Sequence, residues 1–513
     1  MKLASIAEVP PILCKETKST NCIIINQQKQ KKEMKQLFVI SFLAAIAFTS
    51  CSQSEEAFAP PESLNKNYSP QNALIAEIEQ ETVSIAEAQS VATAFLRGNA
   101  NKYSRTAPPP AASAVIALND ESTNQPLLYV INFGNDNGFV IVSASKKTAP
   151  ILAFSESGTF TPSEQSPAQI FLDKYKDDIR KARQDNSDSL RLKYAVQWAA
   201  YEQPRSIVAT QQLTYDMQQR VDAEIKYRES QGYIHLGSIL AAQYYLPEKN
   251  YKVLLQEMQR CSDPQYNYQE TVHIFIKSYE YRHVDPLMVT DWHQGPPFNV
   301  NAKNGLAGCV PIAIAQIVYY HKFPSKYDWE NIYSIPVAND AFVDFITDIR
   351  DLCKVSYNEG ATSAKFENAE SALKKLGYTI SEGGVPTVSL LQKEVSNKRP
   401  VFIEGFQESG GGHAWVCDGW QERRYDAIAT FIPNRNDPRF ELTRTSSNGF
   451  AVYTTSLYPH GTVNADWSED YFFFHMNLGW GKDDNAWYTY NTNFYKSNVK
   501  PFLNDQNTIL ISK

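Results

Sequence analysis

A glycine, a cysteine and a long apolar run stand together in the second half of this 513-residue chain. Gly308 and Cys309 precede residues 310–320, where almost every side chain is apolar, and this pattern predicts a buried helix that begins at the cysteine. Pro311 agrees with that boundary, because proline is tolerated in the first turn of a helix and not in its interior. Backbone N–H groups without helical partners and the positive end of the helix dipole stabilise a thiolate at such a position. The sequence therefore predicts a nucleophilic sulfur, against the alternative that Cys309 merely fills a core.

Two residues farther along the chain are predicted to be partners of this sulfur. His413 follows the glycines at 410–412 and heads an alternating strand, so its imidazole is predicted to act as general base and acid from a rigid element. Asn477 ends the aromatic strand 471–477, and its side-chain amide is predicted to accept a hydrogen bond from the histidine ring N–H. A lone histidine is more often a packed residue, and a lone asparagine is more often a turn residue. The order Cys309, His413, Asn477 is what predicts a Cys-His-Asn triad.

Four residues near these positions are predicted to contact the substrate or an oxyanion. Gln294 precedes the cysteine and is predicted to donate a side-chain N–H to an oxyanion, alongside the backbone N–H of Cys309. Gly411 and Gly412 leave a bare backbone that a ligand can approach closely. Trp480 is predicted to border the substrate site and to shield the His–Asn hydrogen bond from water, the alternative being an ordinary core tryptophan.

The composition excludes several classes of function. The formal charge is −7, and Lys and Arg are scattered rather than clustered, so nucleic-acid binding has no support. The seven cysteines show no Cys-x-x-Cys pairing and no histidine spacing typical of a zinc site, and a disulfide framework is not expected in a chain of this size. The length predicts two or three domains, and a hydrophobic content of 43% is enough for their cores.

The N-terminal region resembles an export signal. Met34 opens onto the apolar run 37–48, which is too short to span a bilayer and has the length of a signal-peptide core. Small residues then lead to Cys51, so residues 34–51 resemble a bacterial lipoprotein signal in which this cysteine is lipidated. An ordinary secretory signal is the alternative. We predict export to the cell envelope as an outer-membrane or surface lipoprotein that contacts the membrane through its lipid anchor alone.

The remaining chain divides into three predicted regions. Residues 83–200 combine a helix capped by Ser84 with strand and helix patterns, and they predict a small α+β module without a catalytic cluster. Residues 201–283 are polar and are predicted to be a connector that proteases can reach. Residues 284–513 place helices before strands, which predicts an α+β fold with two packed lobes and a cleft between them. The other predicted segments are a non-native extension at 1–33, with translation starting at Met34, a tether at 52–82, a linker at 107–114, helices at 83–96, 170–182, 341–355 and 365–376, and strands at 127–133, 138–144, 150–154, 400–405, 414–419 and 471–477.

Several blocks of residues together resemble the streptopain family of bacterial cysteine peptidases. The resemblance covers residues 284–513 well and extends to 83–200, which is similar to the inhibitory propeptide of these zymogens. The blocks are Gly308–Val310, Ala315–Ile317, His321–Pro324, Gly411–Gly419, His475–Gly481, Trp292–Gly295 and Pro297–Asn299, with Gly138–Ala144 and Pro150–Phe154 in the first module.

The resemblance implies a papain-like, two-lobed catalytic domain that a propeptide keeps latent until the connector is cleaved. It implies Cys309 as nucleophile, His413 as base and acid, Asn477 as the orienting asparagine and Gln294 as part of the oxyanion hole. No metal or organic cofactor is implied. The implied partners are protein or peptide substrates and the chain's own propeptide, and a monomer is the expected state.

Three positions depart from the family's pattern. Leu478 stands where tryptophan usually follows the asparagine, Lys482 stands where a second glycine follows Trp-Gly, and Pro311 replaces a small residue. A missing indole beside the His–Asn bond would admit water, so lowered activity or relaxed specificity is expected of an enzyme that is still active. Two alternatives stay open: a Cys-His amidase or transferase on the same fold, and a non-catalytic surface lipoprotein that binds protein or glycan with a degenerate cleft.

Overall fold

A computed structural model describes most of the chain from residue 81 onward. The predicted signal peptide with Cys51, the extension before it, residues 52–80 of the tether after it, and Gly411 lie outside the described residues. Within the described residues no helix is both long and apolar enough to cross a membrane. The described residues are 81–98, 111–186, 188–201, 215–238, 272–303, 305–358, 361–406, 412–431, 442–447, 450–455, 467–489 and 507–512.

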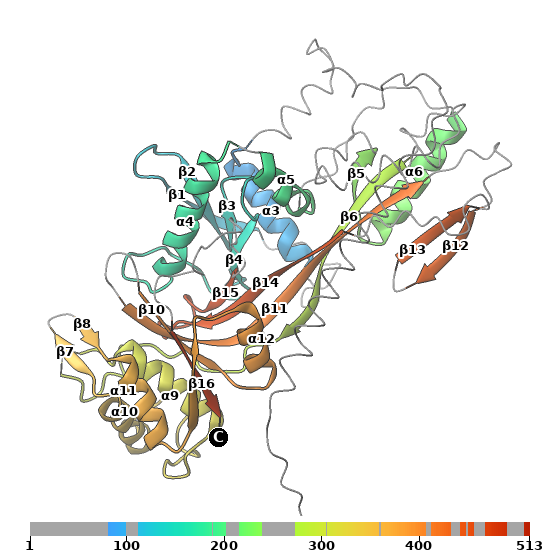
Figure 1. Cartoon of the computed structure of the whole chain (residues 1–513). Coiled ribbons are helices and arrows are strands. Elements are labelled where there is room, and N and C mark those ends of the chain that lie inside the picture. The colour runs from blue at the N-terminus through green and yellow to red at the C-terminus, as the bar shows by residue number, and fades with distance from the viewer. Residues whose placement is uncertain are drawn as a thin grey trace, which may run out of the picture. The chain divides into compact units, whose positions relative to one another are not determined.

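The first module is an antiparallel sheet with helices packed around it (Figure 1). The predicted hairpin is confirmed, because β2 and β3 pair antiparallel with Val130 opposite Ile141. Ser84 caps the first helix as predicted, since its Oγ accepts from the backbone N–H of Glu87 at 3.2 Å. The predicted linker at 107–114 overlaps the start of a strand that the sequence did not indicate. The elements are α3 (Ile85–Gly98), β1 (Ala112–Asn119), β2 (Pro126–Phe133), β3 (Phe139–Ser143), β4 (Ile151–Ser155), α4 (Gln169–Gln184) and α5 (Asp188–Ala199).

The region predicted to be a connector contains regular structure. It includes α6 (Tyr215–Ser230), β5 (Ile234–Ser238) and the long strand β6 (Val272–Val284). β6 pairs with β5 on one side and with β11 (Gly412–Phe431) on the other. The end of this region therefore contributes a strand to the sheet that carries His413.

The C-terminal part joins a group of helices to strands, so the α+β class predicted from the sequence is confirmed. Figure 1 shows α9, α10 and α11 grouped together, and their apolar faces enclose a core around Trp292, whose ring lies 5.2 Å from that of Tyr319. The helices are α9 (Cys309–His321), α10 (Asp340–Leu352), α11 (Phe366–Lys375) and α12 (Val388–Ser396). The remaining strands are β7 (Ser356–Asn358), β8 (Ala361–Ser363), β9 (Thr379–Gly384), β10 (Val401–Phe406), β12 (Leu442–Ser447), β13 (Phe450–Thr455), β14 (Trp467–Asn477), β15 (Ala486–Thr489) and β16 (Asn507–Ser512).

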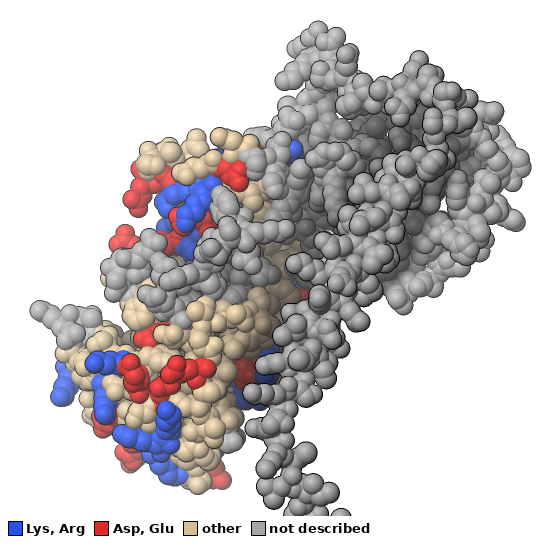
Figure 2. Space-filling view, viewed as in Figure 1, with Lys and Arg blue, Asp and Glu red and all other residues tan. Residues whose placement is uncertain are grey.

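One sheet runs through both parts of the protein. Its strand order is β1-β2-β3-β4-β15-β14-β11-β10-β16-β9, and β4 of the first module pairs with β15, with Phe154 opposite Trp487. The ring of Phe154 lies 5.1 Å from that of Phe473, so an apolar core continues across the junction. On the face shown in Figure 2, acidic and basic side chains are interspersed over the described residues.

A polar cluster is buried where the first module ends. The hydroxyl of Tyr201 lies 3.0 Å from that of Tyr471 and 3.3 Å from that of Tyr425. Beside them the guanidinium of Arg423, which is 1% exposed, lies 4.9 Å from the ring centre of Phe95 in α3. Buried hydroxyls need such partners, because an unsatisfied polar group in a protein interior is costly. Tyr201 therefore fastens the end of the first module to the sheet of the C-terminal part.

We expect Tyr201→Phe to lower the stability of the full-length protein by about 1–3 kcal/mol, because two buried hydroxyls lose their shared partner. The midpoint of thermal unfolding measures this loss. Tyr333→Phe is the control, since its side chain is 46% exposed and its hydroxyl can bond to water. Equal midpoints for the two variants would contradict the role of Tyr201.

Candidate active site

The backbone at the start of α9 requires glycine. Gly308 precedes the helix with φ 95° and ψ 143°, a left-handed conformation that side chains rarely adopt. A Cβ atom there would also lie 3.3 Å from Pro311 Cδ and 3.3 Å from Thr362 Oγ1. This geometry places Cys309 in the first turn of α9, as the sequence predicted. Its side chain is half-buried, whereas Cys353 and Cys417, the other free cysteines of the described part, are buried.

Opposing influences act on the Cys309 thiol. Burial raises its pKa, while hydrogen bonds from the backbone of Ala414 and Val310 lower it. The carboxylate of Glu404 on β10 raises it again. Glu404 is itself buried, and burial together with the charge of Glu367 raises its pKa to about 7. A charge that acts on the Cys309 sulfur therefore changes close to neutral pH.

His413 lies at the start of β11, opposite Gly405 of β10. Its Nε2 is 2.8 Å from the carbonyl oxygen of Leu478, and because a carbonyl only accepts, Nε2 carries the proton. Nδ1 therefore keeps a lone pair, as a general base requires. Burial lowers the pKa of His413 to about 4, against the raising effect of the bond to Leu478. The imidazole stacks on Trp415 with the ring centres 6.1 Å apart.

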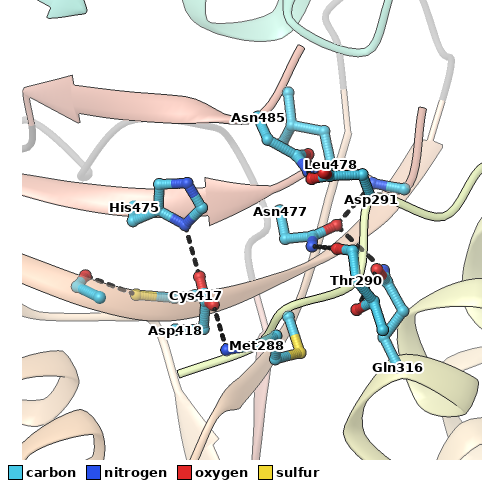
Figure 3. A network of polar contacts seen from close by, with 12 residues as sticks. Met288, Thr290, Asp291, Gln316, Cys417, Asp418, His475, Asn477, Leu478 and Asn485 are labelled. Atoms are coloured by element: carbon cyan, nitrogen blue, oxygen red, sulfur yellow. Dashed lines mark hydrogen bonds and ion pairs between the residues drawn. The ribbon is translucent and has the colours of Figure 1, made fainter. Parts of the chain in front are cut away.

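Asn477 bonds to groups other than His413. Its Oδ1 accepts from Gln316 Nε2 at 3.0 Å and from the backbone N–H of Gly479 at 3.3 Å, and its Nδ2 donates to the carbonyl of Thr290 at 2.6 Å (Figure 3). The sequence predicted a bond from the His413 ring to the Asn477 side chain. In the structure the main-chain carbonyl of the next residue, Leu478, holds that position.

The carbonyl of Leu478 is fixed from two sides. Its side chain is buried, and its backbone N–H donates to Asn485 Oδ1 at 2.9 Å. Asn485 Nδ2 in turn donates to Asp291 Oδ1 at 2.9 Å (Figure 3). Sequence reasoning missed these residues, because a main-chain acceptor leaves no residue-type signal. The side chain at position 478 takes no part in the bond to His413, so leucine there preserves it.

The other predicted site residues lie in segments close to Cys309 and Asn477. Gln294 is 7% exposed, and its backbone carbonyl accepts from the N–H of Ala307, two residues before the cysteine. Its oxyanion role stays a prediction. Gly412 is exposed beside His413, and a Cβ atom there would come within 2.8 Å of the Phe406 ring. Trp480 is 38% exposed, so its indole is available to a ligand.

The two remaining departures from the family pattern are accommodated. Lys482 forms an exposed ion pair of 3.0 Å with Asp136, in the turn between β2 and β3. Such a pair contributes little stability, but it joins the first module to the segment after Trp480. Pro311 is buried in the first turn of α9, where its missing N–H would have no helical partner.

Two family models match separate parts of the chain. Residues 292–345 and 325–488 match the Peptidase C10 family, and residues 80–179 match the Spi protease inhibitor family. The part of the chain from residue 292 to residue 488 is therefore similar to Peptidase C10 proteins, streptopain among them. The predicted resemblance to the streptopain family is thereby confirmed, and a protease-inhibitor domain precedes the peptidase domain.

The named relatives are distant. Streptopain of Streptococcus pyogenes is 26% identical over 168 residues, which are 24% of this chain and 42% of that protein. The thiol protease/hemagglutinin PrtT of Porphyromonas gingivalis is 25% identical over 186 residues, which are 27% of this chain and 21% of that protein. The matched part thus covers less than half of either relative. A solved fragment of prointerpain A from Prevotella intermedia aligns with a TM-score of 0.40 and 14% identity, over 77% of this chain and 97% of the fragment.

We expect Glu404→Gln to make Cys309 react with iodoacetamide several-fold faster above pH 7, because the charge that raises the thiol pKa is gone. Below pH 7 the two rates converge, since Glu404 of the wild type becomes protonated there. Peptide mass spectrometry of the full-length protein, quenched at intervals, measures the alkylation of Cys309.

Glu367→Gln is the matched control. It removes the charge that helps to raise the pKa of Glu404, so Glu404 stays ionised to lower pH and alkylation stays slow over a wider range. If all three proteins have the same alkylation rate at every pH, the influence of Glu404 on the sulfur is absent.

Proposed function

We propose that the chain is the latent form of a cysteine endopeptidase in which Cys309 is the nucleophile and His413 the general base and acid. The observation that carries the proposal is the hydrogen bond from His413 Nε2–H to the Leu478 carbonyl. It fixes the tautomer whose Nδ1 can take a proton, on a strand whose next residue, Ala414, contacts the Cys309 sulfur. The match of residues 292–488 to the Peptidase C10 family supports the same assignment.

The residues support a two-step hydrolysis of a peptide bond. His413 Nδ1 takes the thiol proton, and the Cys309 sulfur attacks the scissile carbonyl carbon. This attack forms a tetrahedral intermediate. Its negatively charged oxygen accepts hydrogen bonds from the backbone N–H of Cys309 and from the side chain of Gln294. The C–N bond then breaks as His413 returns the proton to the leaving amine. Water, deprotonated by His413, cleaves the thioester and restores the thiol.

Two properties of the site support latency in the full-length protein. Burial raises the pKa of Cys309 and lowers that of His413, so both shifts disfavour a thiolate–imidazolium pair at neutral pH. The first module is fastened to the peptidase part by the β4–β15 pairing and by the buried contact between Ser166 Oγ and Asp484 Oδ1, 2.6 Å long. Cleavage in the region 201–283 would sever its covalent link.

The alternatives differ in what they require of the site. A Cys-His amidase or transferase would use the same residues and would prefer small amides to proteins. A non-catalytic lipoprotein would be favoured if the replacement of tryptophan by Leu478 damaged the site. The hydrogen bond that orients His413 argues against this alternative. Its acceptor is the main-chain carbonyl of residue 478, so the bond does not need a tryptophan side chain there.

Export and substrate class are part of the proposal. The signal-like residues 34–51 support export. Cys51 is the proposed lipid attachment site, which would place the peptidase on the cell envelope. The proposed partners are protein or peptide substrates and the chain's own propeptide. We propose Gly411, Gly412 and Trp480 as the residues that bind the substrate beside the scissile bond.

We expect the full-length protein to hydrolyse a fluorogenic peptide only after the connector is cut, either by itself or by an added protease. Cys309→Ala is expected to stay uncut without added protease and inactive with it. N-terminal sequencing of the fragments locates the cut, which we expect between residues 201 and 290. A protein that stays inactive after cleavage, and whose Cys309 fails to react with a peptide electrophile, would rule out the peptidase assignment.

A further inference from the structure

Gln316 is a polar residue in an otherwise apolar helix. It lies on α9 seven positions after Cys309, its exposure is 0%, and every helix residue from Val310 to Tyr319 is buried. A buried amide is costly unless its hydrogen bonds are made. The contacts of Gln316 therefore show what the residue does in this helix.

The Gln316 side chain bonds to two segments outside α9. Its Oε1 accepts from Thr290 Oγ1 at 2.8 Å and from the backbone N–H of Trp292 at 3.4 Å. Its Nε2 donates to Asn477 Oδ1 at 3.0 Å (Figure 3). Asn477 completes the circuit, because its Nδ2 donates to the carbonyl of Thr290 at 2.6 Å. Gln316, Asn477 and Thr290 thus form a closed ring of hydrogen bonds.

Main-chain groups fix the direction of every bond in this ring. The Trp292 N–H can only donate, so the atom of Gln316 facing it is the amide oxygen. The Gly479 N–H identifies Asn477 Oδ1 in the same way, and the Thr290 carbonyl requires the Asn477 amide nitrogen. The two amides therefore have one arrangement that satisfies all partners, which makes the ring rigid.

Each segment that meets at Gln316 delivers one part of the site. Its own helix begins at Cys309, and the segment of Thr290 and Trp292 leads directly to Gln294. Asn477 precedes Leu478, whose carbonyl orients His413. We propose that Gln316 is a positioning residue, which sets the placement of the nucleophile's helix relative to the carbonyl that orients the histidine. The catalytic importance that we infer for Gln316 rests on the proposed peptidase function.

Gln316→Glu tests the ring with almost no change of shape. The neutral carboxyl can still donate to Asn477 Oδ1, whereas the ionised carboxylate cannot. We therefore expect kcat of this variant to approach that of the wild type at low pH and to fall by tenfold or more as the pH rises, with KM little changed. The wild type is expected to show no such loss over the same range.

Gln316→Met removes all of the bonds while it keeps the approximate volume. We expect kcat per titrated active site to fall by about ten- to a hundredfold, since small misplacements of reacting groups have effects of this size. The limb of the pH profile that reports His413 is expected to move to lower pH, because the bond to Leu478 that raises the histidine pKa is weakened.

Ile314→Ala is the matched control for lost stability. Ile314 is a fully buried residue of the same helix without a polar atom in its side chain. We expect its replacement to lower the thermal midpoint while kcat per titrated site and the pH profile stay as in the wild type. If both Gln316 variants behave like Ile314→Ala, Gln316 is a structural residue and the proposal is wrong.

The pH dependence of Cys309 alkylation separates this inference from the peptidase assignment. The alkylation rate is measured for each full-length variant after its connector has been cut. This measurement does not require that the variant hydrolyse peptides. An altered profile in Gln316→Met without hydrolysis by any protein would support the positioning role and reject the peptidase. An unchanged profile in both Gln316 variants would reject the positioning role, whatever the wild-type activity.

Discussion

The hydrogen bond between His413 Nε2 and the Leu478 carbonyl is the interaction on which the arrangement of the site depends. It joins the start of β11 to the end of β14, strands that already pair with Val416 opposite Asn477. The bond assigns the tautomer of the imidazole, and so decides which nitrogen can act on a proton. Because the acceptor belongs to the main chain, sheet pairing and the Asn485 side chain control it, and the residue type at position 478 has little influence.

The groups around the Cys309 sulfur have opposing effects on its ionisation. A helix terminus and the backbone of Ala414 favour the thiolate, while burial and the Glu404 carboxylate oppose it. In the full chain the opposing effects prevail, because burial raises the pKa of Cys309 and lowers that of His413 to about 4. Both shifts come mainly from burial, so a change in solvent access or in the charge of Glu404 would change the reactivity of the sulfur.

Local signals predicted the parts of the fold that local chemistry determines. The start of α9 follows from Gly308 and the apolar run after Cys309, and the β2–β3 hairpin follows from turn residues between two apolar strands. The length of β11 could not be predicted in this way, because its second half is paired with β6, a strand far away in the sequence. The site shows the same division: residue types indicated Cys309 and His413, but the acceptor of the His413 bond is a backbone atom that only the fold places.

The sheet shared by the two parts would also affect the protein after the proposed cleavage. While β4 is paired with β15, both strands are internal to the sheet. Departure of the first module would turn β15 into an edge, with backbone donors and acceptors open to any extended chain. Such an edge can add a foreign strand, and it is a site where liberated domains can associate with one another. β15 has four residues, so its edge offers few backbone hydrogen bonds to another chain. This short length would limit association through β15 after the first module departs.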